Sequence, residues 1–103
     1  SITVEMTSDL ISPATTADSY VSGKVTPADY SVIDGIGAVW GKEENPTVTE
    51  NNWSPAKFDQ DGTFNAWVYT ANLAPGTYYI RLYATGIDGT TVYSSRQIKL
   101  VKE

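Results

Sequence analysis

The chain has 103 residues, a formal net charge of −5, and 41% apolar and 12% aromatic residues. It contains no Cys and no His, which excludes a disulfide framework, a thiolate metal site and a Ser-His catalytic triad. Its seven basic side chains are scattered instead of gathered on one face, so we expect no nucleic-acid partner. No apolar run reaches the length of a membrane span, and we expect no membrane insertion by this segment.

A chain of this length suits one domain, residues 1–103, which buries about two thirds of the surface of its unfolded state. The chain starts at Ser1 and ends in the charged pair Lys102 and Glu103, so we expect a domain excised from a longer protein. The low charged fraction of 18% and the many Thr, Ser, Asn and Tyr residues are typical of an exported β-domain.

In the first half of the chain, alternating apolar and polar residues predict short strands. The expected elements are strands at 2–7, 20–26 and 36–40, a connection at 9–18 broken by Pro13, and a short edge strand at 47–49. Residues of one parity along a strand share a face, which gives the expected core side chains Val4, Met6, Val21, Val25, Ile36, Ala38 and Trp40. Residues 51–61 show the least regular pattern.

In the second half, a strand over 64–69 places Phe64, Ala66 and Val68 on the inward face. A corner at 73–76 leads into a strand over 78–85, and Asp88-Gly89 predicts a hairpin turn before the last strand. The fold class we expect is all-β, an Ig-like or fibronectin type III-like antiparallel sandwich of about seven strands.

From Gly23 onward, six short motifs follow one another in a recognisable order. They are Gly23-Lys24-Val25, Gly37–Trp40 with Asn45-Pro46-Thr47, Gly62–Ala66, Leu73–Thr77, Tyr78–Thr85 and Gly89–Tyr93. In this order and spacing the chain resembles the fibronectin type III-like repeats of secreted and cell-surface proteins of bacteria. The resemblance implies a sandwich, an extracellular or cell-surface setting and neighbouring domains as partners, but no common ligand.

The outward face of the 64–69 strand is the main candidate site. Period two places Trp67 and Tyr69 outward, and pairing with the second strand brings Tyr20 beside them, flanked by Asn65 and Lys24. Three interpretations stay open: cross-strand stabilisation, contact with a neighbouring domain, and stacking of a glycan.

Other aromatic residues have structural alternatives. Trp40 is expected in the core, and Tyr78 is expected to bury its ring and send its hydroxyl to nearby backbone. Trp53 either caps the open edge of the sandwich or forms a ligand platform on a loop. A row of Tyr79, Arg81 and Tyr83 suggests a cation–π ladder on the second sheet.

Acidic residues offer no catalytic or metal constellation. Asp59 to Gly62 is similar to the start of a calcium loop, but position twelve is Thr70 instead of Glu, which favours ordinary turn chemistry. Glu43 and Glu44 are adjacent and would point to opposite faces of a strand, so they form no acid/base pair. We therefore expect no enzyme and no cofactor, and a spacer or interaction domain, with carbohydrate binding as the alternative.

Overall fold

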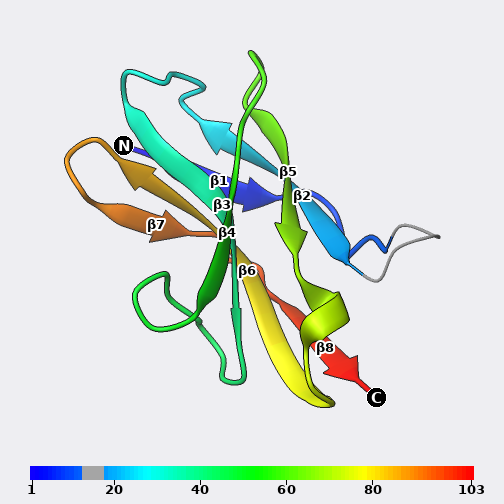
Figure 1. Cartoon of the computed structure of the whole chain (residues 1–103). Helices are drawn as coiled ribbons and strands as arrows, with labels where there is room; N and C mark the ends of the chain where they lie inside the picture. The colour runs from blue at the N-terminus through cyan, green and yellow to red at the C-terminus, as the bar shows by residue number, and fades with distance from the viewer. Residues whose placement is uncertain (13–17) are drawn as a thin grey trace.

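The computed structural model describes residues 1–12 and 18–103, which form two antiparallel sheets packed face to face (Figure 1). The three-stranded sheet has the order β1-β2-β5, with β1 at Thr3–Met6, β2 at Ser19–Thr26 and β5 at Thr63–Val68. The other sheet has the order β4-β3-β6-β7, with β8 also paired to β6: β3 at Ile33–Gly41, β4 at Asn52–Ala56, β6 at Gly76–Gly86, β7 at Thr91–Tyr93 and β8 at Ile98–Lys102. A short 3-10 helix, η1, spans Thr70–Asn72. The expected all-β sandwich class is confirmed.

Strands β7 and β8 are consecutive segments beside one long strand. β7 pairs with residues 83–85 of β6, and β8 pairs with residues 76–80 of β6. Between the two segments, Ser94 bridges the gap, because its amide donates to the carbonyl oxygen of Leu82 and its hydroxyl accepts from the Leu82 amide. The eight strand segments therefore occupy seven strand positions.

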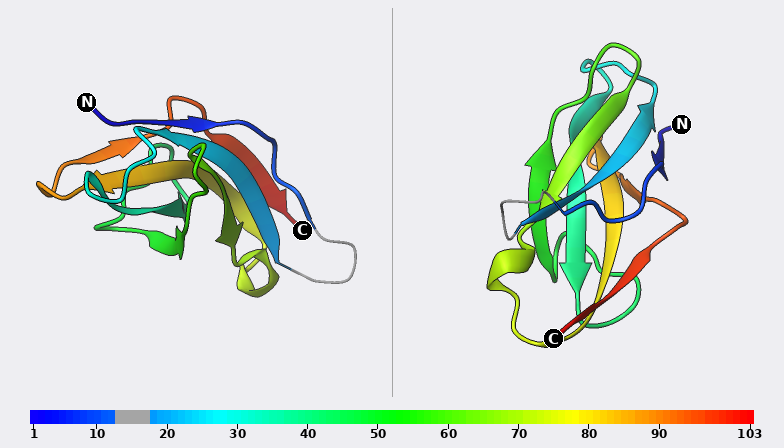
Figure 2. Two further views of the ribbon diagram at one scale, coloured as in Figure 1. Left: turned by 90° about the horizontal axis from the view of Figure 1, so that it is seen from above. Right: turned by 90° about the vertical axis from the view of Figure 1, so that its right-hand side faces the viewer.

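The molecule is elongated, with extents of 41 × 28 × 18 Å. Figure 2 shows the two termini toward opposite ends of the sandwich. Because β1 belongs to the three-stranded sheet and β8 to the larger one, the chain enters through one layer and leaves through the other.

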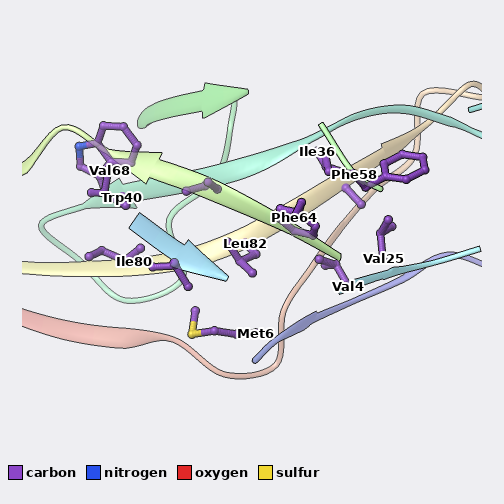
Figure 3. Packing of buried hydrophobic residues seen from close by; sticks show 14 of the residues in the cluster. Val4, Met6, Val25, Ile36, Trp40, Phe58, Phe64, Val68, Ile80 and Leu82 are labelled. Atoms are coloured by element: carbon purple, nitrogen blue, oxygen red, sulfur yellow. The ribbon is translucent and has the colours of Figure 1, made fainter. Parts of the chain in front are cut away.

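The core lies between the two sheets and follows the expected parity. Buried side chains include Val4, Met6, Val21, Val25, Ile36, Ala38, Trp40, Phe64, Ala66, Val68, Ile80, Leu82 and Ala84. Trp40 is 2% exposed, which confirms its expected place in the core, and Figure 3 shows it near Val68, at the opposite end of the core from Phe58. Tyr78 is also buried and donates its hydroxyl to the carbonyl oxygen of Ala74 at 2.7 Å, so the expected corner is confirmed.

The edge strand expected at 47–49 is wrong. These residues form a turn, in which the amides of Glu50 and Asn51 both donate to the carbonyl oxygen of Thr47. The strand lies instead at β4, inside the stretch with the least regular pattern. Gly37 permits it, because a Cβ at that position would collide with the carbonyl oxygen of Ser54. Pro13, expected to interrupt the first connection, lies outside the described residues.

The position of β4 decides the strand order that the sequence left open. In the constant-type immunoglobulin order the fourth strand joins the strand equivalent to β5. Here β4 pairs with β3, with Ser54 opposite Ala38. The buried hydroxyl of Ser54 donates to the carbonyl oxygen of Trp67 in β5. This hydrogen bond connects the two sheets at the side of the sandwich where β4 and β5 are the edge strands.

Candidate functional site

The outer face of the three-stranded sheet carries four of the six residues expected to form a site. Tyr20 and Trp67 are directly opposite one another in the β2–β5 ladder, and their rings meet edge to face, with centroids 5.4 Å apart at 61°. Trp67 is 43% exposed. Because the two rings are not coplanar, they do not form one continuous flat platform.

Polar neighbours of this aromatic pair are held by the same ladder. Ser22 donates its hydroxyl to Oδ1 of Asn65 at 2.7 Å, across the register pair. Lys24, opposite Thr63, is exposed at the far end of the pairing. We call Tyr20, Lys24, Asn65 and Trp67 the sheet-face patch.

Tyr69 lies elsewhere, although its parity along the sequence is that of Trp67. Strand β5 ends at Val68, and the chain then turns into η1. The ring of Tyr69 packs edge to face against Trp40, with centroids 5.5 Å apart at 88°. Among the described rings, no contact joins Tyr69 to Trp67. The structure therefore brings Tyr69 to the end of the core.

Trp53 lies on strand β4, so it is not on a loop. It is 51% exposed and packs edge to face on Tyr83, with centroids 6.2 Å apart. Tyr83 is buried beneath it, and burial together with nearby Tyr93 raises the pKa of Tyr83 to about 12. Trp53 thus covers part of the outer face of the larger sheet.

The cation–π ladder suggested for Tyr79, Arg81 and Tyr83 does not form, because Arg81 lies over the ring of Tyr93 instead. The guanidinium of Arg81 lies 3.8 Å from the ring centroid of Tyr93, and its Nε donates to the carbonyl oxygen of Pro46 at 2.8 Å. The amide of Val48 donates to the Tyr93 hydroxyl at 3.1 Å. These contacts fasten the loop at 42–51 over this face, so Arg81 and Tyr93 have a structural role.

A groove lies at the end of the sandwich where β3 ends, β4 begins and η1 follows β5. It has a volume of about 480 Å³, and we call it the end groove; its lining includes Trp40, Asn51, Asn52, Trp53, Tyr69 and Asn72. This volume falls within the range of small-molecule sites. Sequence reasoning missed it, because its residues come from three separate segments of the chain and only their amide and aromatic chemistry is visible in the sequence.

A second hollow adjoins the end groove and shares Trp40, Asn51, Asn52 and Asn72 with it. It has a volume of about 1020 Å³ and is also lined by Lys42, Glu43, Glu44 and Glu50. Three carboxylates and one ammonium group give the lining of this hollow a net negative charge.

Trp40 is the buried side of the end groove and has an unmet hydrogen bond. Its Nε1 is inaccessible to solvent and has no hydrogen-bond partner in residues 1–12 and 18–103. A buried donor without a partner costs about 1–3 kcal/mol of stability.

In three turns, an aspartate carboxylate accepts a hydrogen bond from a backbone amide of the same turn. Asp29, Asp61 and Asp88 each accept a hydrogen bond from the amide two residues ahead. The pKa of each is lowered, chiefly by the hydroxyl of Ser31 for Asp29, by the hydroxyl of Thr63 for Asp61 and by the Thr90 amide for Asp88. Asp61 thus takes part in the turn chemistry expected for residues 59–62. Within the described ranges, no cluster of three or more acidic, His or Cys residues has the geometry to hold a metal ion.

Comparisons with known proteins leave the family open. The chain matches no protein-family model, no curated protein and no solved structure. In the part of the chain that the structure describes, no helix has the length and apolar character of a membrane span.

Proposed function

We propose that this domain is a non-catalytic accessory module that spaces and orients the neighbouring domains of a larger bacterial surface or secreted protein. The observation that carries the proposal is the position of the termini toward opposite ends of a sandwich 41 Å long. Chains attached at the two ends are thereby held apart by a packed core. The lack of His and Cys removes the commonest general base and the thiolate nucleophile, and this supports a non-catalytic role.

A surface beside the N-terminus supports contact with a neighbour. A hollow of about 610 Å³ is lined by Ser1 together with the apolar side chains of Ile2, Val32, Ile87 and Val92. Ile87 is 68% exposed and lies in one hollow with the other apolar side chains, and a group of exposed apolar side chains marks a contact surface more than a single one does. A domain joined at this end would bury these side chains.

Single-molecule energy transfer tests the spacer role. The chain has no Cys, so Ser1→Cys and Glu103→Cys introduce two unique dye sites at the ends. A rigid spacer gives one narrow transfer-efficiency peak that stays constant in urea until the domain unfolds. A broad or shifting distribution below the unfolding transition would show that the module does not hold its ends apart.

Carbohydrate binding on the sheet-face patch is the second candidate function. The half-exposed indole of Trp67 beside Tyr20, with the Asn65 amide next to them, favours it. Tryptophan fluorescence, titrated with soluble polysaccharides, tests this function. A saturable change that is absent in Trp67→Ala supports binding at the patch, and the same change retained in Trp67→Ala excludes the patch as its source.

A further inference from the structure

The outer face of the larger sheet carries a hollow that the loop at 42–51 borders on one side. It has a volume of about 440 Å³, and we call it the outer-face hollow; its lining includes Asp34, Gly35, Val48, Trp53, Pro55 and Tyr83. Pro55 and Tyr83 share this face, because both lie opposite Gly37, one on each side of β3. A Cβ at Gly35 would meet no atom within 4 Å, so the absence of a side chain there leaves the floor of the hollow open.

Two aromatic side chains of the outer-face hollow have hydrogen-bond donors that no described residue uses. Trp53 is half-exposed and stands edge to face on Tyr83, which is only 5% exposed. Neither Nε1 of Trp53 nor the hydroxyl of Tyr83 makes a hydrogen bond within the described ranges. In that part of the chain, Nε1 of Trp40 is the one buried side-chain polar atom that lacks both a partner and contact with solvent. The Tyr83 hydroxyl is therefore accessible to a ligand oxygen without a rearrangement.

The polar groups of the hollow favour a ligand that offers acceptors and few donors. The indole N–H only donates, and burial raises the pKa of Tyr83 to about 12, so its hydroxyl stays protonated at neutral pH. The hydroxyl of Thr85, which also lines the hollow, is already bonded to that of Thr91 at 3.0 Å. A peptide carbonyl supplies the acceptor, and proline brings it without an N–H of its own. Proline-rich segments dock in aromatic-lined grooves of this kind.

Charge selects a basic residue at the other end of the hollow. The exposed carboxylate of Asp34 makes no hydrogen bond within the described ranges, and the lining contains no Lys or Arg. The net charge of −5 adds a long-range attraction for a cation. Trp53 lies opposite residue 39 of β3, and from residue 34 to residue 39 a strand rises about 16 Å, at about 3.3 Å per residue. A polyproline II segment covers this distance in about five residues.

We infer that the outer-face hollow binds an extended, proline-containing segment of a partner chain, with a proline on Trp53 and Tyr83 and a basic side chain on Asp34. Carbonyl oxygens of the segment accept hydrogen bonds from the Tyr83 hydroxyl and from Nε1 of Trp53. Proline-rich segments populate the polyproline II conformation before they bind, so little conformational entropy is lost. The site is independent of the spacer role and lies on the opposite sheet from the sheet-face patch.

Nuclear magnetic resonance tests the inference, because the three Trp residues give three indole N–H signals, which Trp53→Phe and Trp67→Phe assign. The ¹⁵N-labelled domain is titrated to millimolar concentration with two capped hexapeptides, five prolines followed by arginine and the reverse order. We expect a saturable shift of the Trp53 signal with at least one of them, while the Trp40 and Trp67 signals stay in place. Matched peptides with glutamate for arginine, or with alanines for the prolines, are expected to bind at least about tenfold more weakly.

Four outcomes overturn the inference. The first is a flat Trp53 signal with both proline–arginine peptides, and the second is a shift confined to Trp67, which moves the site to the sheet-face patch. The third is equal binding of the alanine peptides, which assigns the hollow to a cationic side chain alone. The fourth is a Trp53 shift with cellohexaose and none with the peptides, which assigns it to a saccharide. None of these bears on the spacer role, which the dye-labelled domain tests separately.

A variant that fills the hollow locates the contact. Gly35→Val places a side chain in open space, so it is expected to weaken binding of the proline–arginine peptide at least about tenfold and to leave the urea midpoint in place. Thr3→Val is the matched control, because it introduces the same side chain at an exposed position of β1 in the other sheet. Parent-like binding in a folded Gly35→Val domain would contradict the assignment.

Two further variants decide the case if Gly35→Val fails to fold. Tyr83→Phe removes only the hydroxyl and is expected to weaken binding about tenfold, whereas Tyr79→Phe, outside the hollow, is expected to bind like the parent chain. Asp34→Asn is expected to reduce the preference for arginine over glutamate in the peptide. Unchanged binding in Tyr83→Phe together with an unchanged preference in Asp34→Asn would overturn the inference.

Discussion

The hydroxyl of Tyr30 donates to the carbonyl oxygen of Phe58 and accepts from the amide of Phe58, each at 3.0 Å. The two rings also stack, with centroids 3.9 Å apart at 13°. Tyr30 is 59% exposed, whereas Phe58 is buried at one end of the core. One surface tyrosine therefore fixes both the backbone and the ring of a core residue that lies outside any strand.

The first prediction concerns the stacking and hydrogen bonds between Tyr30 and Phe58, which we call the Tyr30–Phe58 clamp. Tyr30→Phe keeps the stacked ring but removes both hydrogen bonds, so we expect the free energy of unfolding to fall by about 1–3 kcal/mol. Urea unfolding followed by circular dichroism measures the change. Tyr79→Phe is the control, since the Tyr79 hydroxyl has no hydrogen bond to the described residues. Equal losses in the two variants would contradict the role of the clamp.

The second prediction compares two tryptophans of opposite parity. Trp40→Ala opens a large cavity in the core and is expected to cost about 3–5 kcal/mol, a large part of the stability of a small domain. Trp67→Ala removes a half-exposed ring and its contact with Tyr20, so its cost is expected to be well below that of Trp40→Ala. Thermal unfolding by circular dichroism ranks the two. The opposite ranking would mean that the inward and outward faces of the sheets are exchanged.

The third prediction is loss of stability at alkaline pH. The pKa of Tyr83 is raised to about 12 by burial, whereas an unfolded tyrosine titrates near pH 10. The native state therefore holds its proton longer, and the contribution of Tyr83 is complete below about pH 10 and is lost as the pH rises toward 12. Unfolding free energies measured across this window should decline less steeply in Tyr83→Phe, which keeps the ring beneath Trp53. Parallel curves for the two proteins would argue against a buried, protonated Tyr83.

The fourth prediction is loss of stability in acid. The pKa values of Asp29, Asp61 and Asp88 are lowered by hydrogen bonds within their turns. Their contribution is present above the unfolded pKa of about 3.9 and is lost as the pH falls through the lower native values. Urea midpoints between pH 7 and pH 2 should therefore fall less in the triple Asp→Asn variant.

Asp34→Asn is the control for the acid series, since the Asp34 carboxylate makes no hydrogen bond within the described ranges. We expect its acid profile to follow that of the parent chain. A triple variant with the same acid profile as Asp34→Asn would show that the turn carboxylates do not couple stability to pH.

Period-two alternation predicted the parts of the fold in which a strand is long and buried on one side. Trp40 and Phe64 were placed inside and Trp67 outside, because successive side chains of a strand must alternate. Strand β4 was not predicted, because it contains Pro55 and owes its position to the close approach that Gly37 permits.

The candidate sites could be predicted only in part, for a related reason. The pairing of Tyr20 with Trp67 follows from register, which parity fixes once two strands pair. Parity does not predict the position of Tyr69, because β5 ends at Val68, and beyond the end of a strand the alternation no longer determines where a side chain points. The end groove depends on tertiary contacts among segments distant in the sequence, such as Trp40 with Tyr69, which no local pattern encodes.

The entry of the chain through one sheet and its exit through the other has a mechanical consequence. A pull on the two ends draws β1 along β2 and β8 along β6, nearly parallel to the strands. Under that load the ladder hydrogen bonds of each pair share the force simultaneously, instead of opening one after another as in a zipper. Forced unfolding is governed by the unfolding rate. We therefore expect this domain to unfold at a higher tension than one whose terminal strands peel away one hydrogen bond at a time.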